Sequence, residues 1–251
     1  YDLWGTPLDF LPKDAETCAI REYIKRADDV AFSEAKKIYT NSQIVSKRLM
    51  DFNGVQSTPL YPPVYNPSQF FCNSYGDYIY YTSRICRSKR QLLAVEAMKY
   101  TKTPVKLKLS GKAEDPAYMQ KIEQYIRKNH LEKKVEVMNR WISEEEKCQL
   151  FGDCLASIYI PFDEDSYGYP SLEAHESMKA VISCTDSGGT KELIIDGKNG
   201  FLCDSTPQAL AEKMDFLYEN RDICAQMGQW GKERLSELGI NWDTVIQRLT
   251  E

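Results

Sequence analysis

From about residue 77 onward, the sequence alternates between short β-rich segments and amphipathic segments with helical spacing. The segment 77–83 is rich in tyrosine, and the segment 115–130 places Tyr118, Ile122 and Ile126 on one stripe of a helix. This alternation is typical of βαβ units, which build a parallel sheet with helices on both faces. We therefore predict an α/β fold, a Rossmann-like doubly wound parallel sheet, with ligands bound at the carboxyl ends of its strands.

The other elements are predicted from the same periodicity. Further strands are expected at 105–110, 135–138, 155–160, 181–184 and 201–203, and further helices at 88–100, 143–151 and 170–178. Ser143 and Glu146 have the spacing of a capping box. The tail 207–251 has a helical pattern throughout, with breaks expected near Gly228, Gly231 and Gly239.

Residues 1–62 do not continue this pattern. They predict a helix at 15–29, a short strand near 38–40 and a second helix at 42–52, with too little apolar surface for a core of their own. We interpret 1–62 as a remnant of an N-terminal domain and its linker. The main domain is then 63–238, followed by a C-terminal helix at 239–251.

Composition excludes several classes of partner. The net charge of -5 and the pI of about 5.3 argue against general electrostatic binding to nucleic acid or anionic lipid. No apolar run reaches the length of a membrane span, and no signal peptide opens the chain. We expect a cytoplasmic location with at most peripheral membrane association.

The eight cysteines are scattered, without a CxxC pair. Only two histidines, His130 and His175, are available to join them in a metal site. The sequence therefore predicts free, buried thiols and no metal site.

The segment 165–173 carries two carboxylates eight positions apart around a Gly-x-Pro turn. Gly168 allows the backbone to approach a ligand, Pro170 suits a first helical turn, and the free N–H groups there favour an anion. Glu173 could accept hydrogen bonds from a vicinal diol such as a ribose. The pattern indicates a nucleotide-sugar site, and the alternative is a polar helix start with solvent-facing carboxylates.

Four segments, 40–64, 83–89, 165–173 and 186–192, together resemble the retaining glycosyltransferase family 4. The resemblance covers nearly the whole chain. It implies a GT-B fold, in which two Rossmann-like domains face each other and the C-terminal one holds the nucleotide-sugar donor. This chain would be that donor domain, and the acceptor-domain residues of the family, including a catalytic histidine, would lie outside it. We expect the chain to be inactive by itself.

The resemblance implies three residues with catalytic roles. Arg84 and Lys89 match the basic pair that clamps the donor diphosphate and stabilises its departing charge. A solvated basic run on the surface is the alternative for this pair. Asp165 stands where the family usually has glutamate, and it would contact the transferring sugar.

Further residues are implied to bind the donor. Glu173 matches the ribose-binding glutamate, while Gly168 and Tyr169 would present backbone N–H groups to the sugar and phosphate. The others are Gly188, Gly189 and Glu192 in one turn, Arg140, Trp141 and Ile142 beside the base, and Gly111 in the opposite loop. An ordinary loop explains the glycines of that turn almost as well, and Trp141 also fits a position at the edge of the core.

The chain departs from the family pattern after the motif. Met178 and Ala180 stand where the family commonly has Gly and Pro, so the usual left-handed cap residue is lost and the helix end must be satisfied in another way. His175 lies two positions after Glu173 and so faces away from it. We interpret His175 as structural.

The implied reaction is a metal-independent, retaining transfer of a hexose from a nucleoside-diphosphate sugar to a glycan or lipid-linked glycan, without a cofactor. The lead-in 161–165 resembles mannosyl-type members from bacterial surface-polysaccharide pathways, which points to GDP-mannose. Two alternatives stay open. One is a nucleotide-sugar epimerase of the same fold, which would be expected to carry more histidines, and the other is a module that binds the nucleotide sugar without transferring it.

Overall fold

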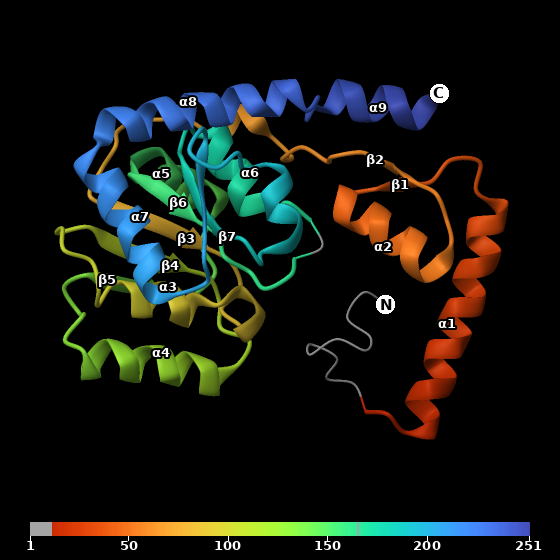
Figure 1. Cartoon of the computed structure of the whole chain (residues 1–251), viewed down its shortest axis with the longest axis horizontal. Helices are drawn as coiled ribbons and strands as arrows, with labels where there is room; N and C mark the ends of the chain where they lie inside the picture. Colours follow the sequence, from red (N-terminus) through yellow and green to blue (C-terminus); the bar gives the residue numbers. More distant parts are fainter. Residues whose placement is uncertain (1–11, 165) are drawn as a thin grey trace. The chain divides into compact units, whose positions relative to one another are not determined.

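The computed structural model of the chain describes residues 12–164 and 166–251. The chain divides into two units, residues 1–61 and 62–251, and each is considered by itself (Figure 1). Among the described residues, no helix combines the length and the apolar character that a membrane crossing requires.

In its described residues, 12–61, the first unit contains two helices and a two-stranded parallel sheet. Its elements are α1 (Ala15–Glu34), β1 (Tyr39–Thr40), α2 (Gln43–Asn53) and β2 (Thr58–Pro59). Ser42 caps α2 by accepting a hydrogen bond from the Val45 N–H, and Gly54 ends it with a left-handed φ of 66°. Helix α1 extends beyond its predicted end at residue 29 because neither Gly nor Pro follows before residue 34.

The second unit is built on a six-stranded parallel sheet with the order β5-β4-β3-β6-β7-β8. Its strands are β3 (Tyr78–Thr82), β4 (Lys106–Ser110), β5 (Val135–Met138), β6 (Ala156–Ile158), β7 (Val181–Cys184) and β8 (Gly200–Cys203). The strand order reverses between β3 and β6. In open α/β sheets, the crevice at the carboxyl ends of two such strands is the usual ligand site.

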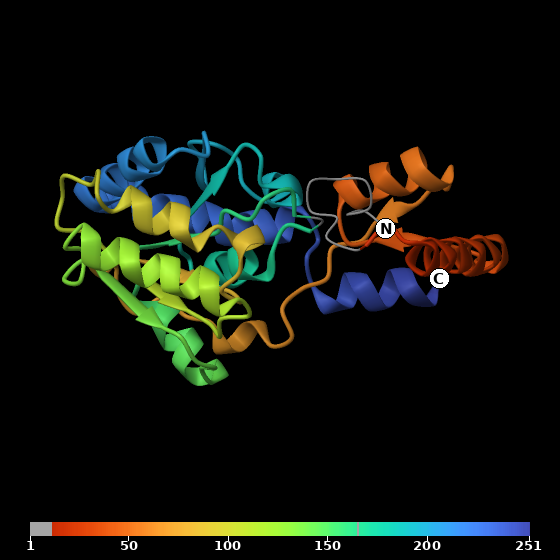
Figure 2. The ribbon, with the colours of Figure 1, turned by 90° about the horizontal axis from the view of Figure 1, so that it is seen from below.

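Helices cover both faces of this sheet, which confirms the doubly wound prediction. They are α3 (Gln91–Ala97), α4 (Pro116–Lys128), α5 (Glu144–Asp153), α6 (Tyr169–Glu176), α7 (Pro207–Glu219) and α8 (Arg221–Glu237), followed by α9 (Trp242–Thr250). Short 3-10 helices occur at η1 (Pro67–Gln69), η2 (Arg87–Lys89) and η3 (Gly188–Glu192). Figure 2 shows α3 and α4 side by side, in yellow and light green.

The core consists of two apolar clusters, because successive side chains along a strand point to opposite faces of the sheet. On β3, Ile79 and Tyr81 join the apolar cluster formed with α3, α4 and α7, whereas Tyr78 and Tyr80 join a second cluster with Phe151 of α5. The two clusters lie on opposite faces of the sheet, so that every helix of the alternation buries one apolar side.

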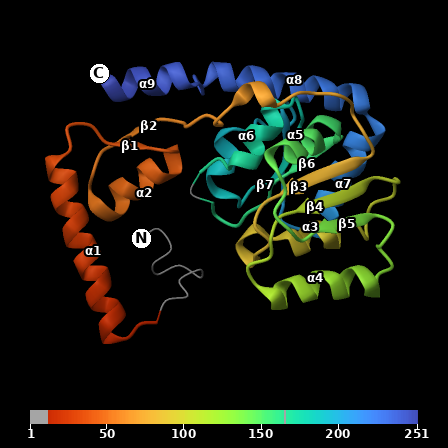
Figure 3. The ribbon, with the colours of Figure 1, turned by 180° about the vertical axis from the view of Figure 1, so that it is seen from behind.

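The predicted helix breaks near Gly228 and Gly231 are wrong, because α8 runs through both positions. The predicted break near Gly239 is confirmed, and a further break lies at Asn220. A Cβ atom at Gly228 would lie 1.9 Å from the Met178 carbonyl oxygen, and one at Gly231 would lie 2.3 Å from His175 Nδ1. These glycines therefore permit close packing of α8 on α6 (Figures 1 and 3).

The end of α6 shows how the missing cap glycine is replaced. Met178 itself adopts the left-handed conformation, with φ of 53°. Its N–H donates to the His175 carbonyl, and the Lys179 N–H donates to the Ala174 carbonyl at 2.8 Å. These two bonds form a Schellman motif with Met in the place that Gly usually takes.

Two smaller predictions are only partly right. The Glu146 N–H donates to Ser143 Oγ at 3.1 Å, but the Glu146 carboxylate pairs with Arg140, so half of the capping box forms. All eight cysteines are free, but Cys18 is exposed and two more are only half-buried. The five buried thiols are Cys148, Cys154, Cys184, Cys203 and Cys224.

Candidate functional site

The described residues predicted to bind the donor follow the carboxyl ends of five neighbouring strands. Arg84 and Lys89 follow β3, and Gly111 follows β4. The others are Arg140, Trp141 and Ile142 after β5, Gly168, Tyr169 and Glu173 after β6, and Gly188, Gly189 and Glu192 after β7. Parallel strands bring these loops to one edge of the sheet, with the reversal between β3 and β6 at the centre.

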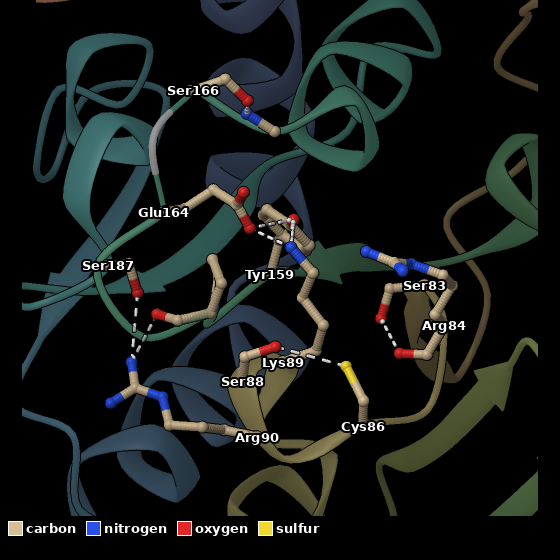
Figure 4. A network of polar contacts seen from close by, with 12 residues as sticks. Ser83, Arg84, Cys86, Ser88, Lys89, Arg90, Tyr159, Glu164, Ser166 and Ser187 are labelled. Carbon is tan, nitrogen blue, oxygen red and sulfur yellow. Dashed lines mark hydrogen bonds and ion pairs between the residues drawn. The ribbon is translucent and has the colours of Figure 1, made fainter. Parts of the chain in front are cut away.

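The side chain of Lys89 is largely buried. Its Nζ donates to the Tyr159 hydroxyl at 2.9 Å and pairs with the Glu164 carboxylate, and Tyr159 also donates to Glu164 at 3.1 Å (Figure 4). The Tyr81 hydroxyl donates to the Lys89 carbonyl and fixes the backbone. With 13% of its side chain exposed, Lys89 is not a solvated surface lysine.

Arg84 is placed differently, with 60% of its side chain exposed. Its guanidinium donates to Glu114 at 2.7 Å, and this carboxylate raises the pKa of Arg84. The buried amide of Gln91 donates to Ser83 Oγ and to the Arg84 carbonyl, both at 2.8 Å, which fixes the loop but leaves the guanidinium at the surface.

Arg90 is a site-forming residue that the sequence analysis missed. Its guanidinium donates two hydrogen bonds of 2.8 Å to Asp186 and further ones to the carbonyls of Ile160 and Pro161. Arg90 therefore connects the loops after β3, β6 and β7. Its backbone has a φ of 55°, which is uncommon for residues other than glycine. The available signal was the basic run 87–90 and an acid in the turn 186–192.

The glycines of the site are required by neighbouring loops. At Gly168, with φ of 76°, an added Cβ atom would lie 2.1 Å from the Tyr159 ring. At Gly111 it would lie 1.9 Å from the Ser83 carbonyl, and at Gly188 2.2 Å from the Glu164 carbonyl. The Gly189 N–H donates to that same Glu164 carbonyl at 2.8 Å. Close packing between loops thus accounts for Gly111, Gly168 and Gly188.

Glu173 lies on α6 and is buried, so the alternative of a solvent-facing carboxylate is wrong for this residue. Lys147, on α5, donates to Glu173 Oε1 at 2.6 Å. Burial raises the pKa of the Glu173 carboxyl, and the Lys147 ammonium acts in the opposite direction. Tyr169, four positions earlier, is exposed at the start of the same helix.

His175 on α6 is structural, as predicted. Its Nδ1 lies 3.1 Å from the Lys179 carbonyl oxygen, and its ring is fully buried against α8. Burial lowers the pKa of His175 to about 4. The ring is therefore neutral near pH 7 and turned away from Glu173.

The loop after β5 forms an open edge of the site. Arg140 donates to both carboxylate oxygens of Glu146, at 2.8 and 2.5 Å. Trp141 is 72% exposed, so its alternative placement at the edge of the core is wrong. Both side chains line a surface groove of about 530 Å³ whose other wall is the start of α4 and the loop before it. Ile142 is half-buried beside them.

Asp165 lies outside the described residues. Both flanking residues, Glu164 and Ser166, are described, and the Ser166 hydroxyl accepts a hydrogen bond from the Gly168 N–H at 3.3 Å. In the part of the chain that the structure describes, no three His, Cys, Asp or Glu residues are grouped so that they could hold a metal ion.

Known proteins share both the sequence pattern and the fold. The alpha-1,3/1,6-mannosyltransferase ALG2 of Dictyostelium discoideum is 28% identical over 146 residues, which are 56% of this chain and 34% of that protein. The chain thus spans about a third of the length of this curated relative.

Two solved structures show the fold. The Anabaena protein HepE in complex with UDP and glucose superimposes with a TM-score of 0.79 at 20% identity, over 92% of this chain and 67% of that chain. The C-terminal domain of the glycosyl transferase group 1 family protein LpcC from Francisella tularensis gives a TM-score of 0.58 at 24% identity, over 70% and 94% of the two chains.

The fold class predicted from the sequence, a Rossmann-like doubly wound parallel sheet as in one half of a GT-B fold, is confirmed by these similarities. The family model described as glycosyl transferases group 1 matches residues 69–234, from η1 to within α8. This range contains the six strands of the sheet and the loops at their carboxyl ends. The chain therefore belongs to the glycosyl transferases group 1 family.

Proposed function

We propose that this chain is the donor-binding part of a retaining glycosyltransferase of family 4, which transfers a hexose from a nucleoside-diphosphate sugar to a glycan acceptor. The observation that carries the proposal is the burial of Lys89, in η2 after β3, and of Glu173, on α6 after β6, on the two sides of the strand reversal. Burying charged side chains costs free energy, and a binding site for a charged, hydroxyl-rich ligand would explain why these two side chains are buried.

In this proposal Arg84 and Lys89 bind the diphosphate, and Glu173 accepts hydrogen bonds from the ribose. Lys89 pairs with Glu164 when the donor is absent, and the diphosphate would take over that ammonium. Asp165 would contact the transferring sugar. The bond from the sugar carbon to the diphosphate breaks, the bond to the acceptor oxygen forms on the same face, and the acceptor proton passes to the departing phosphate.

We propose GDP-mannose as the donor, because the matching ALG2 protein is named a mannosyltransferase. The HepE structure holds UDP and glucose, so UDP-glucose is the competing donor to test. Since the chain covers 67% of HepE, the acceptor would bind largely outside this chain, and we propose that the chain by itself transfers no sugar. We also propose a cytoplasmic location with at most peripheral membrane contact.

A panel of UDP, GDP, ADP, CDP and dTDP, with and without Mg²⁺ or a chelator, tests donor binding by thermal unfolding. At ~100 times the dissociation constant, the preferred diphosphate should add about 2.7 kcal/mol to the free energy of unfolding. This corresponds to a melting-temperature rise on the order of 5–10 °C. We propose that no metal is needed, since Arg84 and Lys89 supply cations. A rise that requires Mg²⁺ would contradict this part, and no rise with any nucleotide would contradict donor binding.

The role of Asp165 is tested by calorimetric titration with the diphosphate and with the complete nucleotide sugar. Asp165→Asn should bind the bare diphosphate like the wild type and bind the nucleotide sugar more weakly, by roughly 1–3 kcal/mol. Equal weakening of both ligands would show that Asp165 does not act on the sugar.

A further inference from the structure

Lys147 and Glu173 form an ion pair between two helices that start at the ligand edge of the sheet. Lys147 is on α5 and Glu173 on α6, and their Nζ and Oε1 atoms are 2.6 Å apart. Only 16% of the lysine side chain and 11% of the glutamate side chain are exposed. Lys147 also pairs with Glu144 at 3.0 Å, one turn earlier on α5 and largely exposed.

Burial and Lys147 act in opposite directions on the charge of Glu173. Burial favours the protonated carboxyl and raises the pKa of Glu173, whereas Lys147 favours the carboxylate. Burial also lowers the pKa of Lys147, but Glu173 and Glu144 together hold this pKa above its usual value. Glu144 and Cys148 on α5 and Tyr80 on β3 also act on Glu173 or are acted on by it. Of these three groups and Lys147, Lys147 carries the positive charge.

Lys147 also fixes the orientation of the carboxylate. Its bond uses Oε1, and Glu173 Oε2 has no hydrogen-bond partner among the described residues. A buried carboxylate held through one oxygen is presented in a defined direction through the other. A neutral side chain at position 147 would leave a buried carboxylate without a counter-charge, and such groups take up a proton.

We propose that Lys147 is a positioning residue for ribose recognition, which keeps Glu173 ionised and directs its second oxygen toward a hydroxyl of the nucleotide. This inference rests on the proposed function, because it takes Glu173 as the ribose-binding carboxylate. Lys147 lies on α5, whereas Glu173 lies on α6. Nucleotide binding would therefore depend on the charge of a side chain on a second helix.

The test compares the affinities for the preferred ribonucleoside diphosphate and for its 2′,3′-dideoxy analogue. The wild type should prefer the ribonucleotide by at least about tenfold, since hydrogen bonds to a charged group are lost in the analogue. Lys147→Met should lose most of this preference near pH 7, and Lys147→Arg should retain more of it. Glu144→Gln is the matched control, because it removes only the exposed partner of Lys147, and it should keep the wild-type preference.

The pH dependence gives a readout that a purely structural role would not change. Without Lys147, the pKa of Glu173 should be higher than in the wild type. The ribose preference of Lys147→Met should therefore return as the pH is raised. As the pH is lowered, the variant should lose this preference at a higher pH than the wild type does. A Lys147→Met protein that keeps the wild-type preference at every pH would overturn the inference.

Two further comparisons keep the inference testable. If Lys147→Met does not fold, Lys147→Met with Glu173→Gln removes both charges, and it should match Glu173→Gln alone in ribose preference. A clear difference between these two proteins would overturn the inference. A wild type that binds no nucleotide would instead contradict the proposed function. One that binds the nucleotide without any ribose preference would contradict the ribose-binding role of Glu173, and with it the role of Lys147, but not donor binding.

Discussion

The site contains two kinds of charged group, inner groups and rim groups. The inner groups are Lys89 and Glu173, whose side chains are buried and paired with Glu164 and Lys147. The rim groups are Arg84 and Arg140, which are 60% and 55% exposed although their ion pairs, at 2.7 and 2.5 Å, are about as short as the 2.6 Å pair of Lys147 and Glu173. Distance alone does not separate the two kinds. Exposed pairs contribute little because water screens them, whereas breaking a buried pair leaves an uncompensated charge.

This comparison suggests a division of labour. The inner groups lie in elements that flank the strand reversal, and their positions are set before a ligand arrives. The rim groups can reorient at little cost. We therefore expect changes at inner positions to affect folding and binding together, and changes at rim positions to affect binding only.

The largest effect is expected at Gly168, which supports the inner groups. Gly168→Ala should lower the free energy of unfolding by about 2–5 kcal/mol, because of its positive φ and the clash with Tyr159. Displacing Tyr159 should also disturb Lys89 and weaken diphosphate binding. Gly197→Ala is the control, since Gly197 has φ of 71° but open space around it, and it should cost about 1–2 kcal/mol. Urea unfolding measures both, and equal losses would exclude the Tyr159 contact as the cause.

An intermediate effect should separate Lys89 from Arg84. Lys89→Met should weaken diphosphate binding by roughly 1.5–3 kcal/mol, because it removes a charged hydrogen-bond donor from a buried position. Arg84→Met should cost about 1 kcal/mol or less, since water screens its exposed guanidinium.

Calorimetric titration of the two variants at low and high salt makes this comparison. The loss at Arg84 should shrink with salt more than the loss at Lys89. A larger loss for Arg84→Met than for Lys89→Met would reverse the assignment of inner and rim groups.

The smallest effect is expected at Trp141 on the rim. Trp141→Ala should change the free energy of unfolding by less than about 0.5 kcal/mol, because its indole is largely in water. If the ring stacks on the base, the variant should bind the nucleotide about 1 kcal/mol more weakly. Trp242→Ala is the control, since Trp242 Nε1 donates to the Val64 carbonyl at 3.0 Å, and it should lower stability without changing affinity. Unchanged affinity in Trp141→Ala would remove this residue from the donor site.

The sequence predicted the fold better than the side-chain partners. The strands at 135–138 and 181–184 were predicted with their observed ends, because short segments rich in β-branched residues carry a local signal. Gly228 and Gly231 of α8 were misinterpreted as helix breaks, because glycine occurs both where helices end and where two helices pack closely. Only the position of α6 against α8 distinguishes the two uses.

Arg90 and Lys147 were missed for a related reason. Their partners Asp186 and Glu173 are far away along the chain, and no local spacing connects the members of either pair. The roles of Arg84, Lys89 and Glu173 as donor-binding residues stay predictions, although the structure places all three in loops or helix starts at the ligand edge.

The βαβ alternation, the parallel sheet and the family could be predicted from the amino-acid sequence, because periodicity and ordered motifs are properties of short segments. Which charges are buried and which are exposed could be learned from the folded chain only, since burial depends on elements brought together from distant parts of the chain. Lys89 and Arg84 illustrate this. They are five positions apart in one basic segment, yet packing against Tyr159 and Glu164 buries one of them and leaves the other in water.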